Sequence, residues 1–189
     1  MNNITVDDIK RLQTDNYNVF GEMATPLFIK NILVASLNSE ENKYFNILRA
    51  WDFRNDVKSK GATVFYLSWK YFEDTVWNDE FAKAPAVIKK PFEITLLEAV
   101  LKDSAFKFLD NINTSTVETL QDIITAAFKK AVIEIKDLEN KNRLEWAKYK
   151  STKVQHLAKL EPFGKYNLPI GGGTHCINAT KSNHGPSWR

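Results

Sequence analysis

The chain has 189 residues, 43% of them hydrophobic and 12% aromatic, which is enough apolar surface for one folded domain and excludes a chain that is disordered throughout. The net charge is +3 and the basic and acidic residues are interspersed, so the sequence lacks the concentrated basic face of a nucleic-acid-binding protein. Cys176 is the single cysteine, which excludes an intrachain disulfide and a cysteine-based zinc site. No apolar run approaches the roughly 20 residues of a membrane span. We therefore expect one domain whose partners include neither nucleic acid nor a membrane.

Three helices are expected in the first 51 residues. Residues 5–20 begin with Thr5, an N-cap residue, and acidic residues follow in the first turn, where the helix dipole favours them. A second helix is expected over residues 23–37, with Pro26 in its first turn, where a missing amide hydrogen is tolerated. A third is expected over residues 39–51.

An aromatic stripe marks the next helix, over residues 59–77. Its apolar residues recur at steps of three and four, which is the pattern of one buried helix face: Ala62, Phe65, Trp69, Phe72 and Val76. Such a stripe also invites a cofactor-binding interpretation, but core packing is the ordinary use of this spacing. Pro85 and Pro91 then enclose a connector, and another helix is expected over residues 95–109.

The clearest helix pattern follows. Residues 114–116 supply N-cap hydroxyls with Glu118 close behind, and one apolar face repeats through seven positions: Val117, Leu120, Ile124, Phe128, Ala131, Ile135 and Leu138. The pattern covers only about three heptads and lacks paired flanking charges. We therefore expect this helix to pack within its own domain and not in a coiled coil.

After residue 140 the sequence changes character. Pro and Gly interrupt the chain every few residues, so helices are not expected there, and residues 174–177 and 187–189 are predicted as short strands. The expected fold is mainly α, with a helical bundle-like body over residues 4–140. A short irregular or β tail over residues 141–189 completes a single fragment, and the part after residue 160 is expected to be irregular, swapped or intermolecular.

Three groups in the tail have residue types that carry chemistry. The run 171–174, Gly-Gly-Gly-Thr, is similar to a phosphate-binding loop but lacks the following Lys-Ser or Lys-Thr, so a turn that needs positive φ is favoured. His175, Cys176 and His184 offer three zinc ligands at a spacing that matches no common zinc pattern. Ser187 lies near His184, but no third member of a triad is apparent.

Three regions resemble the penicillin amidase family in their order and spacing. Residues 168–173, 178–179 and 184–189 are similar to the family's glycine-rich turn, Asn-Ala strand and Gly-x-Ser-x-Arg strand. Residues 5–27, which include Gln13, Asp15, Asn16 and Pro26, are similar to its helical Gln-x-Asp pattern. Residues 48–52, Leu-Arg-Ala-Trp-Asp, match its Leu-x-x-Trp-Asp segment, with an aromatic-rich helix beyond.

The resemblance implies an N-terminal-nucleophile hydrolase of α+β fold. In that family a precursor cleaves itself and exposes a serine whose own α-amine acts as base, while backbone amides and an asparagine stabilise the oxyanion. By the family's order these groups, and the residues that bind calcium in some members, precede position 1, and further strands follow Arg189. Met1 is therefore expected not to be the true start. No catalytic, cofactor-binding or metal-binding residue is assigned, and calcium is expected only in the parent enzyme.

The sequence thus predicts a structural and substrate-pocket part of an amide hydrolase (EC 3.5.1 class). Its substrates would carry an acyl side chain on a β-lactam nucleus or a similar amine, as in penicillins, cephalosporins or acyl-homoserine lactones, and the chain alone is expected to be inactive. The expected partners are the small subunit and the missing sheet strands, with self-association through exposed strand edges. The family resemblance places the parent in the periplasm or outside the cell.

An alternative of a different class is a free-standing helical protein-interaction domain. In that hypothesis exposed aromatic side chains, Trp77, Trp146 and Trp188, dock a partner protein.

Overall fold

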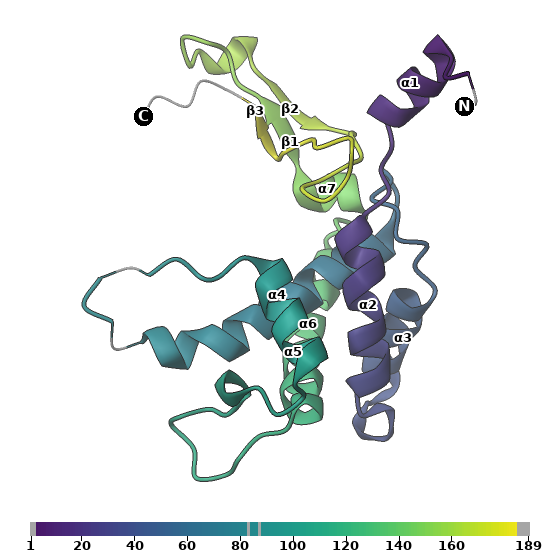
Figure 1. Ribbon diagram of the computed structural model, residues 1–189. Coiled ribbons are helices and arrows are strands. Elements are labelled where there is room, and N and C mark those ends of the chain that lie inside the picture. The colour runs from purple at the N-terminus through teal and green to yellow at the C-terminus, as the bar shows by residue number, and fades with distance from the viewer. Residues whose placement is uncertain (1–2, 83, 87, 185–189) are drawn as a thin grey trace. The chain divides into compact units, whose positions relative to one another are not determined.

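The structure, a computed structural model, describes residues 3–82, 84–86 and 88–184 and is mainly α-helical, as expected. Its α-helices are α1 (Val6–Gln13), α2 (Val19–Asn31), α3 (Ser39–Arg49), α4 (Lys60–Phe81), α5 (Glu93–Lys102), α6 (Leu120–Asn140) and α7 (Trp146–Lys150). The strands β1 (Thr152–Val154), β2 (Lys165–Leu168) and β3 (Asn183–His184) form a sheet of order β2-β1-β3 (Figure 1). β1 is antiparallel to β2 and parallel to β3.

The chain divides into two compact units. The first, here called the junction unit, comprises Met1–Glu22, Trp51–Thr63 and Asp137–Arg189. The second, the helical unit, comprises Met23–Ala50 and Val64–Lys136. Three of the four divisions fall within α2, α4 and α6 and the other follows α3, so each unit is assembled from segments that are distant in the sequence.

The helical unit is built around the two apolar stripes that the sequence predicts. On α4, the side chains of Phe65, Trp69 and Phe72 are buried and meet Phe28 of α2, with ring centroids 5.8–6.5 Å apart and the rings edge to face. On α6, the face that carries Phe128 is buried throughout. The core-packing interpretation of both stripes is therefore confirmed.

Polar contacts tie the helices of this unit together. The Tyr71 hydroxyl and the Lys70 ammonium group both donate to Glu134 of α6, at 2.9 and 3.2 Å. The backbone amide of Leu33 donates to the Thr125 hydroxyl at 3.0 Å. These bonds satisfy polar groups at the rim of an apolar core, where an unpaired donor would cost more than an ordinary hydrogen bond contributes.

The ends of the early helices differ from the prediction. The first helix does not reach Phe20: α1 ends at Gln13, a turn follows, and α2 begins at Val19. The turn forms because Asn18 accepts a hydrogen bond from the Gly21 amide at 2.7 Å, which starts a new helix. Pro26 lies inside α2 and not in its first turn. α3 agrees with the prediction, although its N-cap is Asn38.

The later helices also begin and end elsewhere than predicted. α5 covers Glu93–Lys102, and only a 3-10 turn at Lys107–Leu109 follows it. Before α6, the capping hydrogen bonds are made by Thr119 with Asp122 and not by residues 114–116. Val117 is consequently outside the helix and 77% exposed.

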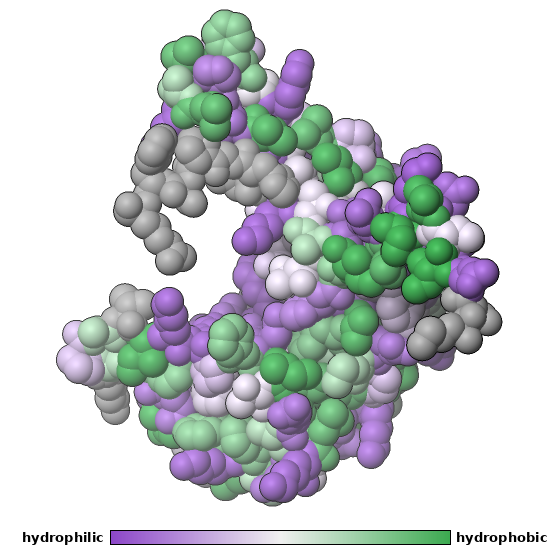
Figure 2. Space-filling model, turned by 45° about the horizontal axis from the view of Figure 1, so that its top comes forward, coloured by the Kyte–Doolittle hydropathy of each residue, from purple (hydrophilic) through white to green (hydrophobic). Residues whose placement is uncertain are grey.

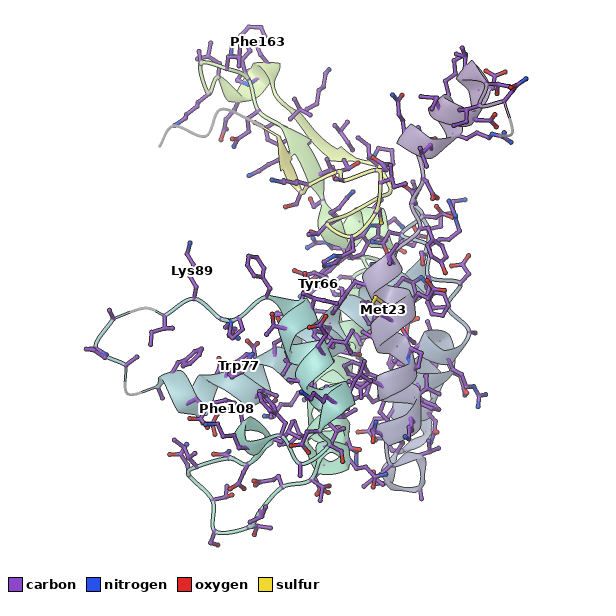
Figure 3. All side chains as sticks on the ribbon, viewed as in Figure 1. Met23, Tyr66, Trp77, Lys89, Phe108 and Phe163 are labelled. Carbon is purple, nitrogen blue, oxygen red and sulfur yellow. The ribbon has the colours of Figure 1, made fainter. Side chains whose placement is uncertain are left out.

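The tail contains elements that the sequence did not suggest. α7 is a helix in a region where none was expected, and residues 174–177 form turns instead of the predicted strand. The second predicted strand, 187–189, lies outside the described residues. The β1–β2 connection bears Phe163, which is 68% exposed (Figure 3).

Apolar side chains also remain on the surface. α1 buries none of its residues, and Val6, Ile9 and Leu12 are all exposed. Figure 2 shows hydrophobic and hydrophilic residues interspersed over the face that it presents. Within the described residues, none of the helices combines the length and apolar character needed to cross a lipid bilayer.

Candidate functional site

Segments from two of the regions that carry the family resemblance meet in the junction unit, together with the residues that follow the Trp-Asp pair. Residues 15–18, 53–56 and 171–178 exchange main-chain hydrogen bonds: the Asn55 amide donates to the Asn16 carbonyl at 2.9 Å, and the Gly172 amide to the Asn55 carbonyl at 2.9 Å. The circuit closes where the Asn178 amide donates to the carbonyl of Asp15 at 2.9 Å. We call these three segments the polar junction.

Asparagine side chains reinforce the polar junction. Asn16 uses both ends of its amide, because Nδ2 donates to Asp56 at 2.8 Å while Oδ1 accepts from Asn178 Nδ2 at 2.9 Å. A buried contact of 3.4 Å joins Asn18 Nδ2 to Asn55 Oδ1. An asparagine carries two donors and one acceptor oxygen, so it can link two other segments at once.

An arginine forms ion pairs with two carboxylates at one side of the polar junction. Arg54 lies 3.0 Å from Asp15 and 3.4 Å from Asp56. Desolvation disfavours its charge, but the hydrogen bond to Asp15 and the charges of both carboxylates outweigh this and raise the pKa of Arg54. Because both of its ion-pair partners belong to the polar junction, this guanidinium group links two segments of the junction.

Trp51, from the Leu-x-x-Trp-Asp segment, is buried in the junction unit. Its indole Nε1 donates to the Arg54 carbonyl at 3.0 Å. A Cβ added to Gly21 or to Gly61 would lie 2.5 Å from the Trp51 ring. Two helices therefore approach the same indole through glycines, which leave room for it.

The glycine run forms the third segment. Gly172 has φ +77°, and a Cβ there would lie 2.1 Å from the Asn178 carbonyl oxygen. The amides of Gly172 and Gly173 donate to Asn55 and Asn178 within the chain. The interpretation as a turn that needs positive φ is confirmed, and a phosphate cradle is wrong because these amides are already used.

The side chains of Cys176 and His175 both contact residues of the junction unit. The Cys176 thiol donates to the Asn16 carbonyl at 3.2 Å, and burial raises its pKa to about 11. At neutral pH it is thus a thiol and not a nucleophilic thiolate. The His175 ring lies against Phe20, with centroids 4.8 Å apart. The described part of the chain holds no group of three or more potential metal ligands, and the side chain of His184 is not among the described ones.

Sequence reasoning missed several members of this arrangement. Arg54, Asn55 and Asp56 begin one residue after the Trp-Asp pair, and a polar Asn-Asp pair after an expected helix end is a signal for a structured turn. Lys150 of α7, to which the sequence assigns no role, is half-buried.

The fold and the polar junction define a mainly helical chain in which polar groups bond to each other and hold three chain segments together. The sequence matches the Penicillin amidase family over residues 1–189, and the chain belongs to that family. It is therefore part of a penicillin-amidase-like hydrolase. None of the curated proteins compared with the chain matches it.

Proposed function

We propose that this chain supports the active-site sheet and shapes the acyl pocket of a penicillin-amidase-type amide hydrolase, while the nucleophile comes from another part of the parent enzyme. The observation that carries the proposal is the polar junction. It joins parts of two regions that resemble the family, residues 15–18 and 171–178, to the segment just after the Leu-x-x-Trp-Asp region, although Asp15 and Asn178 are 163 positions apart in the chain. Such a junction fixes the direction in which the chain leaves residue 180.

The chemistry of the junction supports this division of labour. An N-terminal nucleophile needs a hydroxyl or thiol beside a free α-amine, with donors aimed at the developing oxyanion. In the junction the Cys176 thiol donates a hydrogen bond to the Asn16 carbonyl, and the Asn178 side-chain amide donates one to the side chain of Asn16. These groups serve structure, so we assign the acyl-transfer step to residues outside this set.

The proposed substrate is a linear amide with an acyl side chain, attached to a β-lactam nucleus or a similar amine. The proposed partners are the remaining parts of the parent enzyme, which supply the nucleophile and further strands. The sheet offers a place for them, because within the described residues β2 and β3 each have one neighbour in the order β2-β1-β3, and a strand edge pairs readily with another strand.

The test is an assay of the purified chain with a chromogenic phenylacetyl amide. The proposal predicts no release of the amine above the buffer rate. Turnover that disappears in Ser187→Ala would place a nucleophile inside this chain and overturn the proposal. Turnover that persists in this variant would equally contradict it.

Two of the three tryptophans on which the interaction-domain alternative depends are buried. Trp77 is 5% exposed and packs in a cluster with Phe81, Phe106 and Phe108, its neighbour in Figure 3. Trp146 is 6% exposed. The third tryptophan, Trp188, lies outside the described residues. Buried indoles cannot dock a partner without unfolding their own core.

A further inference from the structure

A lysine of α7 is surrounded by main-chain oxygens. Lys150 Nζ donates to the carbonyl oxygens of Gly171, Gly172 and Thr180, at 2.6, 3.3 and 3.3 Å. We call these three oxygens the carbonyl cage. They belong to the two ends of the stretch 171–180, which contains the third segment of the polar junction, so one ammonium group holds both ends of that stretch.

α7 presents this group from a fixed position. Trp146 and Lys150 are four residues apart and thus lie on one helix face, and Trp146 Nε1 donates to the same Gly172 carbonyl at 2.7 Å. The first turn of α7 is held by main-chain bonds from Trp146 to Ser59 and from Ala147 to Val57, at 2.9 and 3.1 Å.

The cage offers the ammonium group three neutral carbonyl acceptors, and their hydrogen bonds oppose the cost of burying its charge. Among the described residues, Lys150 forms no ion pair with a carboxylate, although its side chain is half-buried. Burial lowers the pKa of Lys150 to about 8, and the nearby Cys176 opposes this shift. The amine is therefore still protonated at neutral pH. Rings of carbonyl oxygens are also the ligands that replace the hydration shell of potassium ions.

We propose that the carbonyl cage is a binding site for a small monovalent cation, which Lys150 fills with its own ammonium group. The class of ligand is ammonium, methylammonium or potassium, because each is compact, singly charged and suited to carbonyl oxygens. The role of Lys150 is to position the stretch 171–180. The inference goes beyond the proposed function and does not depend on it.

The experiment removes the ammonium group by substitution of Lys150 and then supplies small cations in solution. Lys150→Ala is compared with the wild-type chain by thermal unfolding in chloride salts of sodium, potassium, ammonium, methylammonium and tetramethylammonium, at equal ionic strength. In sodium chloride the variant is expected to unfold about 4–8 °C lower than wild type, because the buried Gly171 carbonyl loses its donor. Ammonium and methylammonium are expected to restore most of this difference, and tetramethylammonium, which has no N–H donor, none.

Two further variants sharpen the comparison. Lys148→Ala removes an exposed lysine of the same helix and is expected to respond equally to all five salts, as wild type does. Lys150→Met fills the space with an apolar chain and is expected to lose stability without recovery in ammonium. If Lys150→Ala does not fold in sodium chloride, the yield of refolded protein in each salt gives the same comparison. A Lys150→Ala chain that is as stable as wild type, or that gains equally from every salt, overturns the proposal.

Discussion

A single glycine illustrates how tightly the polar junction is packed. At Gly172 a methyl group meets two obstacles, a left-handed backbone with φ +77° and the Asn178 carbonyl oxygen 2.1 Å from the position of its Cβ. The neighbouring oxygen belongs to backbone and cannot rotate away. Gly172→Ala is therefore expected to lower the free energy of unfolding by about 2–4 kcal/mol, measured by urea denaturation.

The matched control is Gly164→Ala. Gly164 has φ −76°, and the atoms that its Cβ would meet belong to the Tyr166 side chain, which is 45% exposed and can move. A change within about 0.5 kcal/mol is expected there. Equal losses from the two substitutions would show that the Gly172 conformation is not the cause.

Folding shifts the pKa values of Lys150 and Cys176 in opposite directions, so the stability of the folded chain depends on pH in the alkaline range. Burial lowers the pKa of Lys150 from 10.5 to about 8, so between these values the unfolded chain binds one more proton than the folded chain, and stability rises with pH. Burial raises the pKa of Cys176 from 9.0 to about 11, so between these values the folded chain binds one more proton, and stability falls with pH.

The two effects can be separated by substitution. Relative to wild type, Cys176→Ala is expected to gain stability as pH rises from 9 to 11, because it lacks the thiol whose effect falls there. Lys150→Met is expected to lose stability relative to wild type from pH 8 to 10.5. Denaturant midpoints measured across this range check both slopes, and parallel curves for all three chains would contradict the assignment.

Individual residues of the junction were only partly predictable. The sequence indicated that Gly172 needs positive φ, because glycine runs commonly serve turns. It did not indicate that Asn16 and Asn178 bond to each other, since they are 162 positions apart and no local pattern reports a contact of that range. The resemblance placed both residues in family motifs, but only the structure brings the motifs together.

At the scale of elements, α1 and α3 have the same kind of cap but different surroundings. Thr5 with Asp8 and Asn38 with Glu41 both form reciprocal capping boxes. α1 buries no residue, whereas α3 buries Tyr44 among others. A cap on an unburied helix affects only that helix, but a cap on a packed helix affects the fold around it.

This difference predicts two outcomes from equivalent substitutions. Thr5→Ala is expected to speed amide exchange in α1 while leaving the global unfolding free energy within about 0.3 kcal/mol of wild type. Asn38→Ala is expected to lower the global value by about 1 kcal/mol. Hydrogen exchange followed by mass spectrometry and urea denaturation measure the two effects. The idea fails if Thr5→Ala shifts global unfolding as much as Asn38→Ala does.

Elements with a long apolar period were predictable, and their ends were not. The stripes of α4 and α6 appear in the sequence because burial on one helix face requires that period. The break between α1 and α2 was missed because it depends on Asn18 capping the Gly21 amide and on distant partners in residues 53–55. α7 was missed because five residues are too few to show a period, and contacts with Val57 and Ser59 hold it.

At the scale of the whole molecule, the proposed division of labour predicts complementation. Co-expression of this chain with a second chain that carries the family's N-terminal serine is expected to yield hydrolysis of a phenylacetyl amide that neither chain shows alone.

Asn178→Ala removes the side-chain bond to Asn16 at 2.9 Å and loosens the stretch that leads toward β3. A displacement of about 1 Å at a distant reacting group can cost about 100-fold in rate, so a loss of at least tenfold in kcat/KM is expected. Lys148→Ala, on the exposed side of α7, should complement as well as wild type. Full activity with a folded Asn178→Ala chain would show that the polar junction does not position the hydrolytic site.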